Sequence, residues 1–357
     1  MRDSMINMEV KNMKLKKIIA ALTMLTVVAL AGAGCGGSGS DDSASNGEKG
    51  ADKVVIGTQD LLDTSVIAKS EGYFQEAMGD NVEIERLSAG RDINNALMSD
   101  SVEFGMMGIC PTTVGLSSDA GYKVIWIEDL IRGTEGLVAK TDSGINSVKD
   151  MKGKKVGVTL ASSGHYGLLC ALQDEGMTSE DIEMVDLAPD AINSAWARGD
   201  IDVAYTWNPT LINLKNSGGK VLLTGADLAK KGHQTINFHV VRTDFAEENP
   251  EAVKQYCAAL AKGVKLYYDD RDAAYDIVSK YLEMTVENAK EQMSDEYIKL
   301  ENQLDDNALG ADNAAKSIYQ VAKFLEKEGQ IEETRDLDYY KSMIDTSYIE
   351  ALQAEQK

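Results

Sequence analysis

Several residue patterns that would indicate an enzyme, a metalloprotein or a nucleotide-binding protein are missing from this 357-residue chain. Its three histidines, at positions 165, 233 and 239, do not have the spacing of metal ligands. The sequence contains no G-x-S-x-G motif for a serine nucleophile and no glycine-rich signature for nucleotide phosphates. We therefore predict a protein that is not an enzyme, with no catalytic residues, no metal and no cofactor.

Cysteine is also scarce, with four in the chain. Apart from Cys35, the cysteines at positions 110, 170 and 257 have neither metal-like nor redox-like spacing, and their odd number allows at most one disulfide among them. The simplest interpretation is that they are small buried hydrophobic residues.

Basic residues are too few to balance the acidic ones. The chain has 36 Lys and Arg against 58 Asp and Glu, a formal net charge of −22. A surface of this sign repels phosphate backbones and anionic lipid, which argues against nucleic acid as a partner. An anionic ligand would have to be captured by local groups against this overall field.

The apolar run near the amino terminus, Ile18–Leu30, is shorter than the roughly 20 residues that a membrane-spanning helix needs. Lysines precede it and small residues follow, so residues 1–34 are predicted to be an export signal. Ala33-Gly34-Cys35 resembles the lipobox of bacterial lipoproteins, although Leu is usual where Gly32 stands. The resemblance implies lipidation of Cys35, with ordinary secretion as the alternative. Residues 35–52 would then be a flexible polar tether that holds the protein outside the cytoplasm at the cell membrane.

A strand–helix–strand pattern occurs twice, and Ala96 in the first copy corresponds to Ala195 in the second. Two similar α/β units predict a ligand cleft between them. The helical stretches between strands are long enough for crossovers, which predicts mainly parallel sheets, and the chain beyond Pro250 is almost purely helical. The predicted strands are Val54–Thr58, Val82–Leu87, Phe104–Gly108, Val124–Ile131, Gly136–Ala139, Lys155–Thr159, Met184–Leu187, Val203–Thr206, Lys220–Leu223 and Phe238–Arg242.

The first unit needs the C-terminal helices to cover its sheet. We therefore predict an α/β protein with a discontinuous first lobe, residues 53–140 plus 241–357, and a second lobe, residues 141–240, inserted between its parts. Two crossing segments, near Ala139 and Val241, would form the hinge.

The stretch Ser162-Ser163-Gly164 leads from a predicted strand into a helix. Free backbone N–H groups and hydroxyls at the positive end of a helix can hold a small oxyanion. The alternative is that one of the serines only caps the helix. His165 follows them and is more often structural than a catalytic base.

Other candidates lie at strand ends, where open α/β sheets bind ligands. Trp207 ends a strand and could either wall a ligand site or belong to the core. Glu135 precedes the first hinge segment and could hold a cationic group, although an isolated carboxylate is more often solvated. Cys110 ends the corresponding strand of the first copy and would face the cleft from the opposite side.

These motifs resemble the solute-binding proteins of ABC transporters for taurine, aliphatic sulfonates and nitrate, and most closely the taurine-binding branch. The stretches that carry the resemblance are Ser162–Tyr166, Ala191–Asp202, Tyr205–Pro209 and Val240–Phe245, with the less specific Ser147–Val158. The resemblance implies the type II periplasmic-binding-protein fold, two α/β lobes joined by a two-segment hinge.

By the same resemblance, a helix start from Ser162 to His165 would bind the anion, with Trp207 as a cleft wall and Glu135 as a polar contact. Gln59, Cys110 and Asn237 correspond to further cleft positions. Two of these depart from the pattern: Cys110 stands where Ser is common, and Asn237 where the taurine-like pattern has Asp. Loss of that carboxylate weakens the case for an ammonium-bearing ligand.

The resulting hypothesis is a monomeric, membrane-tethered binding protein that captures taurine or an alkanesulfonate and delivers it to an ABC permease. One alternative is a protein of the same fold that binds or makes a thiamin pyrimidine precursor. Another is a sensory module that binds the ligand without delivering it.

Overall fold

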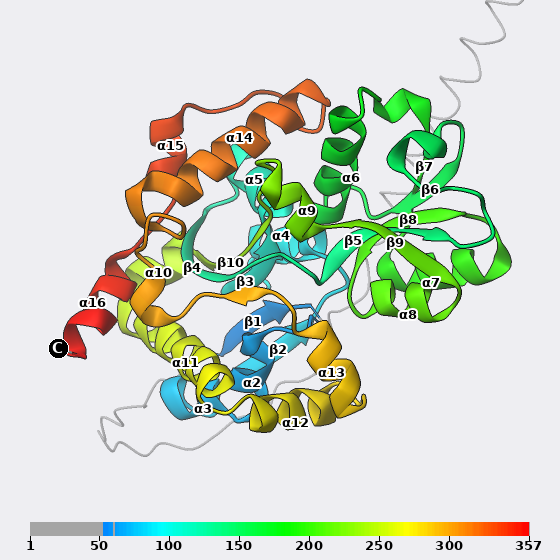
Figure 1. Cartoon of the computed structure of the whole chain (residues 1–357). Helices are drawn as coiled ribbons and strands as arrows, with labels where there is room; N and C mark the ends of the chain where they lie inside the picture. The colour runs from blue at the N-terminus through cyan, green and yellow to red at the C-terminus, as the bar shows by residue number, and fades with distance from the viewer. Residues whose placement is uncertain (1–52, 60, 357) are drawn as a thin grey trace, which may run out of the picture. The chain divides into compact units, whose positions relative to one another are not determined.

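The computed structural model describes residues 53–59 and 61–356, which form two β-sheets with helices around them (Figure 1). The predicted export signal, the lipidation site Cys35 and the tether lie outside the described residues. Within the described part, no helix is both long and apolar enough to span a membrane.

The first sheet has six strands in the order β11-β4-β10-β3-β1-β2. Their bounds are β1 Val54–Thr58, β2 Val82–Arg86, β3 Phe104–Gly108, β4 Tyr122–Leu130, β10 Ile236–Arg242 and β11 Glu296–Tyr297. The second sheet has five strands in the order β7-β6-β8-β5-β9. Its strands are β5 Glu135–Lys140, β6 Lys155–Val158, β7 Glu183–Asp186, β8 Val203–Trp207 and β9 Gly219–Thr224.

Helices before the second sheet and after it cover the first sheet, as the colours of Figure 1 show. These are α2 Thr64–Ser70, α3 Tyr73–Met78, α4 Gly90–Met98, α5 Ile109–Ser117, α10 Thr243–Glu248, α11 Pro250–Asp269, α12 Arg271–Tyr281, α13 Val286–Gln292, α14 Asn313–Lys327, α15 Leu337–Ser342 and α16 Ser347–Glu355. The second sheet has α6 Ser163–Asp174, α7 Pro189–Arg198, α8 Thr210–Asn216 and α9 Gly225–Lys230. Short 3-10 helices lie at Val148–Met151, Ser179–Asp181, Leu300–Asn302 and Gly310–Asp312.

The expectation of mainly parallel sheets is wrong. β1 is parallel to β2 and β3, and β6 is parallel to β7 and β8. β10 is antiparallel to β3 and β4, however, and β5 is antiparallel to β8 and β9. β10 and β5 are the strands that the chain enters on passing from one sheet to the other, and each lies between two strands that run in the opposite direction. The edge strand β11 is also antiparallel to its neighbour β4.

Sheet membership also corrects the predicted boundaries at Lys140 and Val241. β5 lies in the second sheet and β10 in the first, so the chain crosses at residues 131–134 and again between β9 and β10. Apolar content identifies a strand but does not indicate the sheet in which it pairs. The first sheet is discontinuous in sequence, because β10 and β11 follow the strands of the second sheet in the chain.

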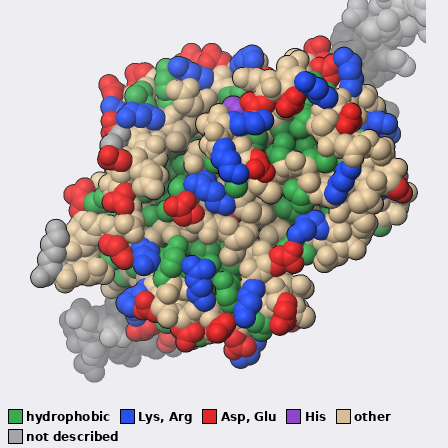
Figure 2. Space-filling view, viewed as in Figure 1, with side chains coloured by type: hydrophobic (Ala, Val, Ile, Leu, Met, Phe, Trp, Pro, Cys, Tyr) green, Lys and Arg blue, Asp and Glu red, His purple; other side chains and the backbone are tan. Residues whose placement is uncertain are grey.

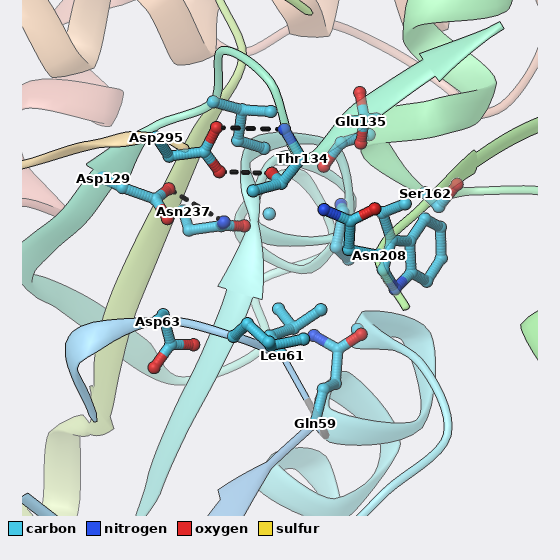
Figure 3. Close-up of a pocket in the computed structure, with 17 residues that line it drawn as sticks. Gln59, Leu61, Asp63, Asp129, Thr134, Glu135, Ser162, Asn208, Asn237 and Asp295 are labelled. Carbon is cyan, nitrogen blue, oxygen red and sulfur yellow. Dashed lines mark hydrogen bonds between the residues drawn. The ribbon is translucent and has the colours of Figure 1, made fainter. Parts of the chain in front are cut away.

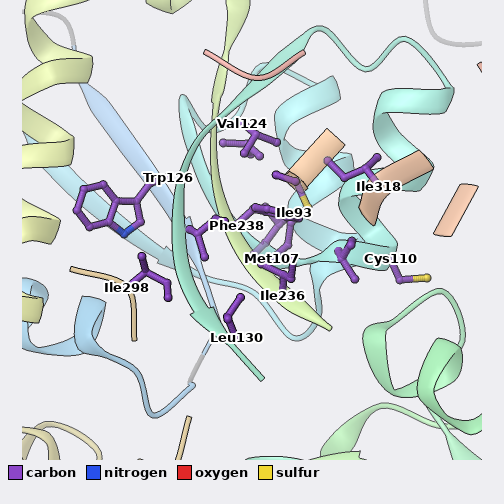
Figure 4. Close-up of a cluster of buried hydrophobic side chains, with 14 of the residues drawn as sticks. Ile93, Met107, Cys110, Val124, Trp126, Leu130, Ile236, Phe238, Ile298 and Ile318 are labelled. Carbon is purple, nitrogen blue, oxygen red and sulfur yellow. The ribbon is translucent and has the colours of Figure 1, made fainter. Parts of the chain in front are cut away.

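The core of the first sheet is built from side chains of several distant segments (Figure 4). Phe238 of β10 and Met107 of β3 are fully buried, as is Ile318 of α14. Phe104 lies between aromatic neighbours, with its ring centroid 4.0 Å from that of Tyr256 on α11. Burial of this kind stabilises a fold by about 25 cal/mol per Å² of apolar surface, so α11 and α14 fix the sheet that carries one wall of the site.

The cysteines at positions 110, 170 and 257 are free and buried, which confirms their interpretation as small core residues. On the face of the molecule in Figure 2, Lys and Arg are interspersed with Asp and Glu.

Candidate ligand-binding site

A cavity lies where strand ends of the two sheets face each other (Figure 3). Its volume open to the centres of water molecules is about 40 Å³, enough for a few waters. Its lining comes from both sheets: Gln59, Leu61, Leu62, Asp63, Gly90, Gly108, Pro111, Asp129, Ile131, Thr134, Glu135, Ser162, Ser163, Trp207, Asn208, Asn237 and Asp295.

Six of the residues singled out from the sequence line this cavity together. They are Gln59, Glu135, Ser162, Ser163, Trp207 and Asn237. They reach it because the carboxyl ends of β1, β6 and β8 and the starts of β5 and β10 all open on the same space. Their roles in ligand binding stay a prediction.

Three predicted residues lie outside the lining. Cys110 is fully buried in the core cluster, where burial raises the pKa of its thiol (Figure 4). The adjacent Pro111 lines the cavity in its place. Gly164 faces Tyr205, whose ring would be 3.2 Å from an added Cβ, so a glycine allows α6 to approach β8.

His165 is the third, and it is structural. Its side chain is buried, and its Nδ1 accepts a hydrogen bond of 3.4 Å from the Ala161 N–H. Burial lowers the pKa of His165 to about 4, so the ring is neutral at neutral pH.

The N-terminus of α6 opens onto the cavity. Ser162 is the N-cap: its Oγ accepts a hydrogen bond of 3.1 Å from the His165 N–H and donates one of 2.6 Å to the Thr159 carbonyl. The capping alternative is therefore correct for Ser162. The Ser163 and Gly164 N–H groups, at the first two helical positions, have no acceptor within the helix. Ala161 turns the chain into the helix in a left-handed conformation, φ 57°, which is uncommon outside glycine.

Glu135 opens β5, directly opposite Trp207 of β8. Its side chain is 2% exposed and its Oε1 has no hydrogen-bond partner. Burial raises the pKa of Glu135 to about 8, and nearby Asp295 adds to this rise while the Tyr205 hydroxyl opposes it. The Glu135 carboxyl is thus largely protonated at neutral pH and can donate a hydrogen bond.

Residues 64–274 match the protein-family model described as NMT1/THI5 like. The chain belongs to the NMT1/THI5-like family. It is 33% identical to the taurine-binding periplasmic protein of Escherichia coli over 219 residues, which cover 61% of this chain and 68% of that protein. It is 29% identical to a putative aliphatic sulfonates-binding protein of Bacillus subtilis over 337 residues, 92% of this chain and 95% of the other.

A solved structure of the alkanesulfonate-binding protein SsuA from Xanthomonas axonopodis pv. citri, bound to MOPS, superposes with a TM-score of 0.70 at 18% identity. The match covers 83% of this chain and 98% of that one. The periplasmic-binding-protein fold with two α/β lobes, expected from the sequence, is thereby confirmed for this member of the NMT1/THI5-like family.

The sequence interpretation missed three cavity carboxylates of this family member, those of Asp63, Asp129 and Asp295. Asp129 lies near the end of β4, and this position at a strand end could have identified it as a candidate site residue. Asp295 comes from the segment after α13, where nothing in the local sequence indicates a site. It accepts hydrogen bonds from the N–H groups of residues 132, 133 and 134 and from the Thr134 hydroxyl, so it orders the first crossing between the sheets.

No Lys, Arg or His is found among the lining residues of the described chain. Nor do the described residues hold a group of three or more His, Cys, Asp or Glu suited to a metal ion. The groups that could contact a ligand are a helix N-terminus at one side, side-chain amides, an indole and several carboxyl groups.

Proposed function

We propose that this chain is the extracytoplasmic solute-binding component of an ABC importer, and that it holds a small sulfonate in the cavity between its two sheets for delivery to a permease. The observation that carries the proposal is the cavity at the start of α6, lined from both sheets. The NMT1/THI5-like relatives named for taurine and aliphatic sulfonates support the ligand class.

The sulfonate would lie at the α6 N-terminus. The helix end carries about half a positive charge, and its free N–H groups suit a tetrahedral oxyanion. The Ser163 hydroxyl and the protonated carboxyl of Glu135 can add hydrogen bonds. Neutral donors hold the anion here, since no basic side chain lines the cavity in the described chain.

The proposal extends to the location and assembly of the protein. The protein would be a monomer anchored through a lipid on Cys35, and its lobes would close on the ligand by hinge motion at the two crossings. A diacylglyceryl mass on Cys35 in membrane-extracted protein is the expected result by mass spectrometry, and an unmodified cysteine there would contradict the anchor.

The ligand class is tested by thermal shift, because a ligand that binds only the folded state raises the melting temperature. Taurine or ethanesulfonate at 100 times its dissociation constant should stabilise the protein by about 2.7 kcal/mol. Ser163→Ala should weaken sulfonate binding roughly tenfold, as expected for a hydrogen bond to a charged group. Ser118→Ala, at an exposed serine after α5, is the matched control and should leave binding unchanged.

Absence of a shift with every sulfonate would contradict the proposal. A shift with a thiamin pyrimidine precursor alone would favour the alternative of the same fold.

A further inference from the structure

The proposed sulfonate site has an unexplained property, which is its number of carboxyl groups. Four carboxyl side chains line the cavity, those of Asp63, Asp129, Glu135 and Asp295, and the described lining contains no basic side chain. The proposed sulfonate contacts use only Glu135, and each of the other three groups would repel an anion when ionised. The inference below rests on the proposed function and asks which sulfonates such a cavity selects.

Asp129 is held in a fixed orientation by a neighbouring strand. It is 2% exposed and lies opposite Asn237 in the antiparallel pair of β4 and β10. The Asn237 side-chain amide donates a hydrogen bond of 2.9 Å to Asp129 Oδ1. The amide at position 237 therefore orients the Asp129 carboxyl group, which comes from the adjacent strand.

Asp63 independently indicates that a hydrogen-bond donor is missing from the cavity. Its Oδ1 accepts hydrogen bonds from the Ser65 hydroxyl at 2.6 Å and the Val66 N–H at 3.2 Å, but its Oδ2 is buried with no partner. The nearby buried cation Lys69 donates to the Thr58 hydroxyl at 2.8 Å and does not line the cavity. A buried carboxylate oxygen without a donor costs free energy, which a donor on the ligand would recover.

The carboxylates and the helix end face the cavity from different sides. In Figure 3, Asp63 and Asp129 lie on one side of the view, and Ser162 and Asn208 lie on the other. A ligand that spans the cavity would meet anion-binding groups at one end and carboxylates at the other.

We propose that Asp129, positioned by Asn237 and supported by Asp63, forms a cation subsite that selects sulfonates carrying a protonated amine over sulfonates that lack one. The ligand class is a short zwitterion, with its sulfonate at the start of α6 and its ammonium group at Asp129.

The electrostatics agree with this assignment. Burial raises the pKa of Asp129 well above its usual range, and the like charges of Asp295, Glu128 and Asp63 add to the rise. An ammonium group at the subsite would lower that pKa again. Binding of an amine-bearing sulfonate should therefore release protons to the buffer, whereas a sulfonate without an amine should not.

Titration calorimetry on the unaltered protein gives the first test. Taurine and isethionate differ only in an ammonium group that replaces a hydroxyl. Taurine should bind at least tenfold more tightly, with a heat that depends on the ionisation enthalpy of the buffer. Equal binding of the two would overturn this inference alone. Absence of binding by either would overturn the proposed function and this inference with it.

A matched pair of variants gives the second test. Asp129→Asn should weaken taurine binding roughly 10- to 100-fold, as expected for a charge-assisted hydrogen bond. It should change ethanesulfonate binding less than threefold and abolish most of the proton release. Glu296→Gln removes an exposed carboxylate beside Asp295, outside the cavity, and should change neither ligand.

Asn237→Ala provides a variant that keeps the Asp129 carboxyl group but removes the amide that orients it. It should show the same selective loss for taurine in weaker form. Equal losses for taurine and ethanesulfonate in both variants would assign Asp129 and Asn237 a purely structural role and overturn the subsite.

Discussion

At the scale of single residues, burial sets the properties of the ionisable groups around the cavity. Glu135 has no charged partner that could offset its loss of water, and its pKa rises to about 8. Glu128, equally buried, has partners: burial acts to raise its pKa, but hydrogen bonds from His239 and Thr64 lower it overall. The Glu128 group stabilises the start of α2, whereas Glu135 remains available to a ligand.

The raised pKa of Glu135 predicts a pH-dependent stability. The unfolded chain releases this proton near pH 4.5, while the folded protein keeps it up to about pH 8. The free energy of unfolding therefore falls as pH rises between these values, by at most about 1.4 kcal/mol per pH unit from this group. Urea denaturation at pH 5, 6, 7 and 8 should show a shallower decline for Glu135→Gln than for the unaltered protein. An identical decline in both would contradict the assignment.

At the scale of elements, the approach of α6 to the first sheet brings the helix end to the cavity. Gly108, the last residue of β3, has ordinary backbone angles, so its lack of a side chain serves this close approach. An added Cβ would be 1.9 Å from the Ser163 Oγ and 3.3 Å from the Ser163 Cβ. Gly108 thereby allows a strand end of one sheet to meet the helix start of the other.

Gly108→Ala should displace the Ser163 hydroxyl and weaken sulfonate binding roughly tenfold, the value for a lost hydrogen bond to a charged group. Gly57→Ala in β1 is a matched control, because its added Cβ would meet no atom closer than 3.4 Å. Calorimetry on both variants checks this expectation. Unchanged affinity in Gly108→Ala would show that the Ser163 hydroxyl has no part in binding.

At the scale of the whole described chain, two ion pairs connect elements of the two sheets. Arg91 on α4 lies 3.3 Å from Asp186 on β7, and Lys215 on α8 lies 2.6 Å from Glu291 on α13. All four side chains are partly exposed, so each pair contributes no more than about 1 kcal/mol. The proposed hinge motion would break both ion pairs when the lobes separate.

The double variant Arg91→Ala with Lys215→Ala should therefore weaken ligand binding by a few-fold, about 1 kcal/mol, without affecting the cavity itself. Small-angle scattering should show a larger radius of gyration for this variant without ligand. Lys265→Ala removes an ion pair within α11 and should leave both quantities unchanged. A ligand affinity equal to that of the unaltered protein would show that the pairs do not favour the closed arrangement.

The sequence by itself determined the strands and much of one wall of the site. Apolar segments such as Phe104–Gly108 and Val203–Thr206 were recognisable because a buried strand requires consecutive apolar residues in the sequence. The same holds for Ser162 and Ser163, since a strand, a cap and a helix follow one another directly. The motifs around Trp207 carried the family resemblance for the same reason.

Only the tertiary structure decided which strands pair and which side chains meet. Long-range pairing placed β5 and β10 in the sheets opposite to those predicted. The same pairing put Asn237 beside Asp129 and brought Asp295 to the first crossing. These contacts join residues more than 100 positions apart, and no local pattern encodes such a distance. Only the tertiary structure therefore decides which carboxyl groups line the site.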